Sequence, residues 1–300
     1  MNVLATAPVV LPMAVDEPMA RTSDIALVVT MSILALSMLA YTGYLAAADG
    51  RRFGTAGQFL AWAGTAALIV TIATRGLSVS RAPLGNMYEF ALAAAGFAML
   101  GFSLWSAVRD TRWLGLFVVG PVLLVLGAAA TAWWTEASQL MPSLQSSWLV
   151  IHVTVATLSI GVFILGFALA VLFLLKRRRE ESGGSWGPAF LDRVPGVDRL
   201  DKFTYSAHII GFPLWTFTLV AGAIWAERSW GRYWGWDPKE VWTFVIWVVY
   251  AAYLHARATR GWTGARAAWL SIVGFLCIVF NYTIVNTYFP GLHSYAGLPS

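Results

Sequence analysis

Long apolar segments alternate with short polar ones along most of the chain. We place them at residues 25–47, 57–78, 87–108, 113–132, 148–175, 205–226, 239–257 and 267–288. An α-helix rises about 1.5 Å per residue, so about 20 apolar residues can cross the roughly 30 Å hydrocarbon core of a bilayer. The pattern therefore predicts an all-α, polytopic membrane protein with about eight transmembrane helices.

The composition agrees with this fold class. Hydrophobic residues make up 58% of the chain and charged residues only 12%, whereas soluble domains carry about 25% charged residues. The net charge of +5 comes from basic residues in short loops, which we interpret as a topology signal rather than a nucleic-acid-binding surface. The single cysteine, Cys277, lies in an apolar segment, so the chain performs no dithiol chemistry of its own.

The basic residues fall in alternate loops, which predicts the orientation. These loops lie around residues 51–52, 109–112, 176–202 and 257–266. The positive-inside rule places them in the cytoplasm, with both chain ends outside. Residues 1–24 are then a short external tail, and residues 25–300 form a single transmembrane domain. We read the polar stretch from Lys176 to Phe203 as a connector between two spans.

An aromatic segment, residues 225–242, falls on the external side and contains "WGRYWGWDPKEVW". Two histidines, His152 and His293, are expected at the same side, and His208 and His255 near the inner one. Two imidazoles can hold a haem iron from opposite sides, and indole faces match a flat porphyrin. Tryptophans also serve as plain interfacial anchors. The residues alone leave both interpretations open.

Charged residues in and near this segment have a structural interpretation as well. In "DPKE", Asp237 suits an N-cap, Pro238 the first helical position and Glu240 a capping box. "NMYEF" repeats the pattern with Asn86 and Glu89. Three cations lie on the side that the topology rule disfavours: Arg228, Arg232 and Lys239. They belong either to a solvated loop balanced by nearby acids or to contacts with an anionic ligand, such as haem propionates.

The chain resembles the CcsA/ResC family of cytochrome c assembly proteins of System II, often called CcsB in actinobacteria. Their hallmark is a tryptophan-rich WWD segment. The resemblance rests on the run from Gly211 to Arg257, which contains "WGRYWGWDPKE", and on "PLGNMYEF", "SSWLVIHV", "YLHAR" and "GLHSY". It extends from about residue 75 to the end of the chain.

The resemblance implies a role for each matching residue. His152 and His293 would be axial ligands of an external haem b, and His255 a ligand at an inner haem-uptake site. The haem-presenting segment would comprise Trp230, Gly231, Tyr233, Trp234, Trp236, Asp237 and Pro238. Arg228 and Arg232 are possible propionate contacts. His208 matches no family histidine, so we expect it to have a hydrogen-bonding or lipid-interface role.

The resemblance also implies a function. The protein would move haem across the plasma (cytoplasmic) membrane and present it externally for thioether attachment to the CxxCH motif of apocytochrome c. It would be the haem-presenting subunit of a cytochrome c synthase (haem lyase) complex, with a ResB-type membrane partner and, indirectly, a thiol-reducing thioredoxin-like protein. Its catalytic residues stay unassigned. The alternatives are a haem b electron-transfer membrane subunit and a System I-type haem-handling protein.

Overall fold

The structure of the protein, a computed structural model, describes residues 15–140 and 144–293, and within these ranges it contains helices and no strand. The "SY" of the "GLHSY" match and most of the expected tail lie outside the described residues. The helices are α1 (Glu17–Ala46), α2 (Arg51–Val79), α3 (Met87–Val108), α4 (Gly115–Thr131), α5 (Ser147–Glu181), η2 (Ala189–Arg193), α6 (Val197–Trp230), α7 (Pro238–Arg260), α8 (Ala265–Phe280) and α9 (Asn286–Tyr288).

The predicted all-α membrane fold is confirmed. Seven helices in the described part of the chain are long and apolar enough to cross a bilayer, when α8 is taken together with its continuation to Tyr288. The remaining predicted span, residues 113–132, corresponds to α4, whose 17 residues make a shorter apolar helix. At about 1.5 Å per residue α4 spans roughly 25 Å, somewhat less than the hydrocarbon core.

Four predicted boundaries were wrong because polar residues extend the helices beyond their apolar parts. One of them is the start of α2, which lies at Arg51 and not at residue 57. The first helix begins at Glu17, not at residue 25, since Asp16 caps it by accepting a hydrogen bond from the backbone N–H of Met19. At its end, α5 continues to Glu181, and α6 already begins at Val197. The connector between them is therefore only residues 182–196, and it includes the short 3₁₀ helix η2.

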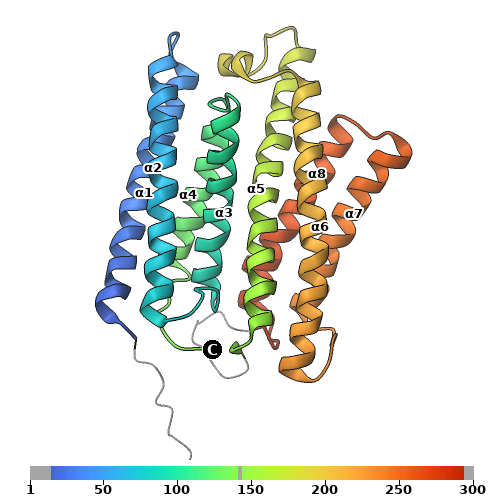
Figure 1. Cartoon of the computed structure of the whole chain (residues 1–300). Helices are drawn as coiled ribbons and strands as arrows, with labels where there is room; N and C mark the ends of the chain where they lie inside the picture. The colour runs from blue at the N-terminus through green and yellow to red at the C-terminus, as the bar shows by residue number, and fades with distance from the viewer. Residues whose placement is uncertain (1–14, 141–143, 294–300) are drawn as a thin grey trace, which may run out of the picture.

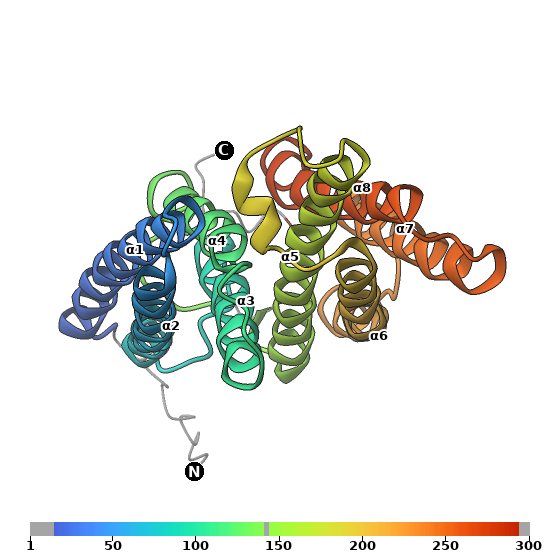
Figure 2. The ribbon, with the colours of Figure 1, turned by 90° about the horizontal axis from the view of Figure 1, so that it is seen from above.

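The helices form a curved row in which neighbours in sequence lie side by side (Figures 1 and 2). α1 packs along α2, α5 along α6, and α3 lies against both α4 and α5. The core centres on α3 and α5, which carry long runs of buried apolar residues. In Figure 1 the α6–α7 loop, the start of α5 and the end of α8 all lie at the lower end of the bundle.

A buried ion cluster holds the loops at this lower end. The carboxylate of Glu89, which is fully buried, pairs with Arg75 at 3.1 Å and with Arg81 at 2.9 Å. Asn86 caps α3 as predicted, by accepting a hydrogen bond from the Glu89 N–H. The Glu89 side chain, however, accepts from the backbone N–H of Gly85, so its role is the ion cluster rather than a capping box. The two arginines also donate to carbonyls after α4, which ties three segments together.

At its lower end α8 changes its winding. Residues Asn281–Val285 form a π-helical turn, and the helix then continues into α9. Such turns hold one extra residue and are frequent at functional sites. Here the turn carries Asn281 and Tyr282 on the side of the helix that lines a cavity.

Candidate functional site

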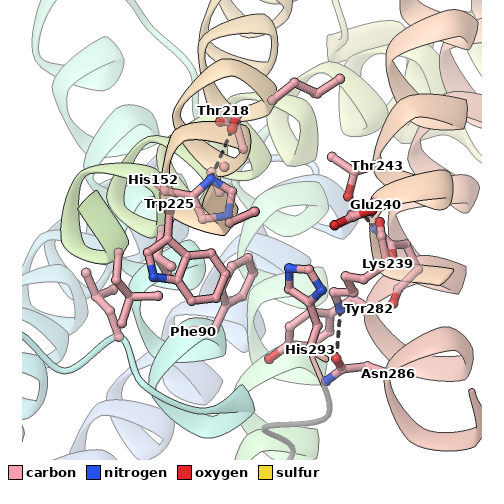
Figure 3. Close-up of a pocket in the computed structure, with 18 of the residues that line it drawn as sticks. Phe90, His152, Thr218, Trp225, Lys239, Glu240, Thr243, Tyr282, Asn286 and His293 are labelled. Atoms are coloured by element: carbon pink, nitrogen blue, oxygen red, sulfur yellow. Dashed lines mark hydrogen bonds between the residues drawn. The ribbon is translucent and has the colours of Figure 1, made fainter. Parts of the chain in front are cut away.

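A large cavity opens among α3, α5, α6, α7 and α8 at the lower end of the bundle (Figure 3). The space not filled by protein atoms is about 1240 Å³, including the part open to solvent. Most of its wall is apolar, with few polar groups, which is the usual character of a small-molecule site. The polar and aromatic lining includes Asn86, Phe90, His152, Trp225, Lys239, Glu240, Asn281, Tyr282, Asn286 and His293.

His152 is presented by the first turns of α5. Ser146 caps that helix by accepting a hydrogen bond from the backbone N–H of Trp148. The imidazole crosses to α6, where its Nδ1 lies 3.0 Å from the carbonyl oxygen of Thr218. The ring fits against α6 because residue 222 is glycine: a Cβ there would lie 2.8 Å from Cε1 of His152. His152 is thereby held with Nδ1 as the hydrogen-bond donor.

His293 is held in a similar way, from a segment remote in sequence. Its Nδ1 lies 3.0 Å from Oδ1 of Asp237, the residue that caps α7. The other oxygen of Asp237 accepts a hydrogen bond of 2.7 Å from the backbone N–H of Leu292. The chain approaches this carboxylate closely at Gly291, where a Cβ would lie 2.3 Å from Oδ2. Asp237 thus fixes both the histidine and its backbone.

Trp225 contacts both histidines (Figure 3). Its ring stacks nearly parallel to His152, with 6.1 Å between centroids, and meets His293 edge to face at 5.7 Å. The two imidazole centroids can therefore be no more than about 12 Å apart. Trp230 completes the cluster, with its centroid 4.8 Å from that of His293. Two histidines separated by nearly half the chain thus meet at one aromatic surface.

Both imidazoles have the arrangement of a metal ligand. A ligating histidine usually donates one ring N–H to a carbonyl or carboxylate, which leaves the other nitrogen for the metal. Nδ1 makes that bond in His152 and His293, and within the described residues neither Nε2 has a hydrogen-bond partner. No group of three potential ligands occurs in the described part of the chain. The two Nε2 atoms are therefore suited to a metal ion that is already bound by other ligands, as the porphyrin nitrogens bind the metal of a metalloporphyrin.

The aromatic loop is fixed by the predicted capping box, which is confirmed. Oε2 of Glu240 accepts hydrogen bonds from the N–H groups of Asp237 and Gly235, at 3.1 and 2.8 Å. Pro238 begins α7, and Gly231 ends α6 in the left-handed conformation. Trp236 also has a positive φ, 59°. Such a conformation costs about 1–3 kcal/mol in a residue with a side chain and is often found at functional sites.

The carboxylate of Asp237 stays ionised in this setting. Burial by itself raises its pKa, but hydrogen bonds from His293 and from the backbone N–H groups of Lys239 and Leu292 outweigh burial and lower the pKa to about 2. Asp237 is therefore negatively charged at any physiological pH. Because a carboxylate accepts from His293 Nδ1, it also fixes the tautomer that leaves Nε2 without a proton in the neutral ring.

The predicted haem-presenting segment divides into two parts. Tyr233 and Trp234 line the cavity and are also exposed, while Trp236 is 76% exposed and points its indole away from the core. Trp230 and Asp237 instead pack around His293. The segment therefore combines an inner part, which holds a histidine, with an outer aromatic surface.

The three cations near the loop have different surroundings. Arg228 is exposed and its guanidinium lies 5.6 Å from the ring centroid of Trp148. Arg232 lies 3.9 Å from Glu240. Only Lys239 is among the cavity-lining residues. Asp237 and Glu240 are both buried, so these two acids are not part of a solvated surface. Arg228, which is exposed, and Arg232, which lies beside Glu240, agree with either of the two sequence interpretations.

The two remaining histidines lie away from the cavity. His255 is exposed near the end of α7, at the opposite end of the bundle from the aromatic loop. His208 is fully buried and its Nε2 lies 2.6 Å from the hydroxyl of Ser271. Of the two roles expected for His208, the structure agrees with hydrogen bonding and not with a position at the lipid interface, because the side chain is fully buried.

Sequence comparison assigns the family. The profile of the family described as Cytochrome C assembly protein matches residues 26–293. The chain belongs to this family. Among curated members, the Cytochrome c biogenesis protein CcsA of Guillardia theta is 34% identical over 248 residues, covering 77% of this chain and 82% of the relative. CcsA of Synechococcus elongatus is 36% identical over 287 residues, covering 81% and 86%.

A solved structure shares the fold of this cytochrome c assembly protein. It is the Cytochrome c Heme Lyase CcmF, with a TM-score of 0.67 and 17% sequence identity. The match covers 93% of this chain and 48% of the CcmF chain, so the chain spans about half the length of that protein. At this identity the similarity is one of fold.

Several cavity residues of this family member were not singled out from its sequence. Thr218 contacts His152 through its backbone carbonyl oxygen, and the identity of a residue does not indicate such a contact. Trp225 was recognised only as the start of the aromatic segment, and Asn281 and Asn286 resemble ordinary polar residues near a helix end. Their common signal is their position on helices that converge on the His152 and His293 region, which becomes visible only in three dimensions.

Proposed function

We propose that this protein binds haem b as its substrate between His152 and His293 and presents it for attachment to apocytochrome c. The observation that carries the proposal is the pair of imidazoles at one cavity, each with Nδ1 engaged and Nε2 free of partners among the described residues. Membership in the Cytochrome C assembly protein family supports a role in cytochrome c biogenesis. The two imidazoles would hold the haem iron through their Nε2 atoms.

In this proposal the protein contributes position and electrostatics, not a nucleophile. Its one cysteine, Cys277, is on α8 and is not among the residues lining the cavity. The thiols that form the thioether bonds belong to the CxxCH motif of the substrate protein, and they add across the haem vinyl groups. The exposed indoles of Trp234 and Trp236 offer the surface on which the edge of the tetrapyrrole rests. The histidine of CxxCH then replaces one of the two protein ligands.

The orientation follows from the basic loops. The ends of the helices opposite the cavity carry the arginine- and lysine-rich segments, so the positive-inside rule places the cavity on the external face of the plasma membrane. His255, at the cytoplasmic end, is then suited to haem uptake together with a ResB-type membrane partner, within a haem lyase complex. A thioredoxin-like reductant would keep the substrate cysteines as thiols.

The test compares holocytochrome c formation by wild type and by the His152→Gly, His293→Gly double variant, each coexpressed with the partner subunit. We expect the double variant to stay folded, with a helix cost of about 1 kcal/mol for the glycine in α5, and to lose both holocytochrome c and the low-spin spectrum of the purified haem-bound protein. The His255→Gly variant should keep its spectrum when haem is added directly but load poorly in cells. Normal maturation of cytochrome c in the double variant would contradict the proposal.

The alternative functions give other outcomes. A haem b electron-transfer subunit would keep its haem through repeated reduction and oxidation, and its loss would leave cytochrome c maturation intact. A System I-type protein would mature cytochrome c without a ResB-type partner. Omitting the partner from the coexpression therefore separates the System I reading from the one proposed, and the CcsA relatives favour the latter.

A further inference from the structure

Lys239 is the cation that reaches the cavity wall, and its charge has no acidic partner there. Its Nζ donates to the carbonyl oxygen of Asn281 at 3.2 Å and to Oδ1 of Asn286 at 2.9 Å. Among the described residues no carboxylate oxygen lies within 4.0 Å of this nitrogen; the ion pairs at this end involve other residues. Two of its three N–H donors are therefore used by neutral acceptors, and one stays available.

The neighbouring acids are already engaged. Asp237 accepts hydrogen bonds from His293, from Leu292 and from the backbone N–H of Lys239 itself. Glu240 accepts from the backbone at positions 235 and 237, and its second oxygen faces Arg232. Neither acid neutralises the ammonium directly. The ring of Tyr282, with its centroid 5.7 Å from Nζ, is the aromatic group over this nitrogen. Charged groups in low-dielectric surroundings are normally paired, so a bound carboxylate would supply the partner that Lys239 lacks among the described carboxylates.

The π-helical turn of α8 adds a second, independent observation. Asn281 is 5% exposed, its Oδ1 has no hydrogen-bond partner among the described residues, and the residue lines the same cavity. Asn286, which is only partly buried, supports Lys239 with its oxygen, and its amide nitrogen donates no hydrogen bond within the described part of the chain. Unpaired buried polar groups are rare in native proteins and call for a ligand or water.

These groups lie beside one of the two histidines. Lys239, Asn286, Asp237 and His293 line a common recess next to the main cavity, and Figure 3 shows Lys239 extending toward Asn286 near the ring of His293. A flat ligand held by His293 would place part of its edge near this ammonium. A carboxylate on that edge would accept from Lys239 Nζ and from the Asn286 amide, while a water on the carboxylate could donate to Asn281 Oδ1.

We propose that Lys239, supported by Asn281 and Asn286, is the carboxylate-recognition site of the cavity and takes one propionate of the tetrapyrrole. This inference rests on the proposed function, since it assumes that the cavity ligand is haem. Lys239 would contact a propionate inside the cavity, whereas Arg228 and Arg232 remain candidate propionate contacts at its rim. A compact ammonium is suited to a single carboxylate oxygen in a narrow recess.

The experiment measures the affinity of the purified full chain for haem and for haem dimethyl ester, whose propionates carry no charge. Absorbance titrations compare wild type with Lys239→Met, Lys239→Arg and the control Lys202→Met, an exposed lysine at the other end of the bundle. We expect Lys239→Met to weaken binding of the free acid about tenfold or more and to leave binding of the diester unchanged. Lys239→Arg should keep most of the preference for the free acid over the diester.

The ratio of the two affinities makes the outcome independent of partial misfolding. If Lys239→Met weakens the acid and the diester equally, or neither, Lys239 has only a structural role and this inference is wrong, although wild type still binds haem. If wild type binds neither ligand, the proposed function fails as well. Asn286→Asp, which sets a carboxylate against Nζ, should lower the preference for the free acid in the same way.

Discussion

Nδ1 of His293 lies 3.0 Å from Oδ1 of Asp237, so a residue in the aromatic loop orients a histidine that follows the last helix. The same aspartate caps α7. One side chain therefore connects the conformation of the loop with the position of a candidate metal ligand. The glycine at position 291 lets the segment that carries His293 approach this aspartate closely.

Replacing Asp237 by asparagine separates its two roles. Asparagine is as good an N-cap as aspartate, so α7 should keep its start. The charged partner of His293 is lost, and second-shell changes of this kind typically cost about 10–100-fold in metal affinity. We expect a matching loss of haem affinity by absorbance titration. Asp16→Asn, at the equivalent cap of α1, is the control and should bind normally; equal losses in both variants would contradict the assignment.

The low pKa of Asp237 predicts a defined dependence on pH. A carboxyl group whose folded-state pKa is lowered stabilises the fold above its ordinary value of 3.8, and this contribution disappears as the pH falls through about 2. Thermal unfolding of wild type and Asp237→Asn should therefore differ by a constant amount above pH 5. The difference should shrink below pH 4. A difference that instead changes between pH 6 and 8 would point to another group.

Gly222 allows His152 to lie against α6. A Cβ at this position would lie 2.8 Å from Cε1 and 3.0 Å from Nδ1 of the imidazole, so Gly222→Ala should push the ring away from Thr218. We expect haem affinity to fall at least about tenfold. Gly127→Ala is the matched control because nothing lies within 4 Å of its added Cβ, and in a helix it should stabilise by about 0.5–1 kcal/mol. Unchanged affinity in Gly222→Ala would count against His152 as a ligand.

The Glu89 cluster should be a large source of stability. Glu89→Gln keeps the shape of the side chain but leaves Arg75, which is only 1% exposed, without its charged partner. Breaking a buried pair in this way costs about 3–5 kcal/mol. We expect a clearly lower unfolding temperature in detergent. Asp110→Asn removes half of an exposed pair with Arg112 and should cost less than about 1 kcal/mol; similar effects of the two changes would refute the distinction.

The strained backbone at Trp236 gives a prediction in which stability and function diverge. Glycine adopts φ of 59° without strain, so Trp236→Gly should keep or raise the unfolding temperature while removing an indole that is 76% exposed. If that indole supports the ligand, haem retention and holocytochrome c yield both fall. Ser80→Gly, at the other described non-glycine residue with positive φ, is the control and should alter neither.

The helices were predictable because each one corresponds to a continuous run of apolar residues that is long enough to cross a bilayer. The capping of α7 was predictable for the same reason, since Asp237, Pro238 and Glu240 are neighbours in sequence. Helix ends were placed less well: hydropathy marks where a helix leaves the apolar layer, whereas α5 continues to Glu181 with i,i+4 ion pairs from Lys176 and Arg177. Hydropathy does not detect that extension.

The site was predictable only in part. The expected ends of their spans placed His152 and His293 on one face, and the structure brings them to one cavity. The partners of their Nδ1 atoms could not be foreseen, because the carbonyl of Thr218 and the carboxylate of Asp237 lie 66 and 56 residues away in sequence. For Glu89 the sequence pattern "NMYEF" was misleading, because it predicted a capping box. The side chain instead forms ion pairs with Arg75 of α2 and with Arg81 in the loop after α2.

The wide turn at Asn281–Val285 makes the winding of α8 a functional parameter. Because the turn accommodates one extra residue, the same residues wound as a regular α-helix would each be rotated, beyond this point, by about 100° around the helix axis. Asn286 would then point away from Lys239, and the segment leading to His293 would leave the bundle in a new direction. A chain with every side chain named here but a regular helix at this place would be unable to assemble them.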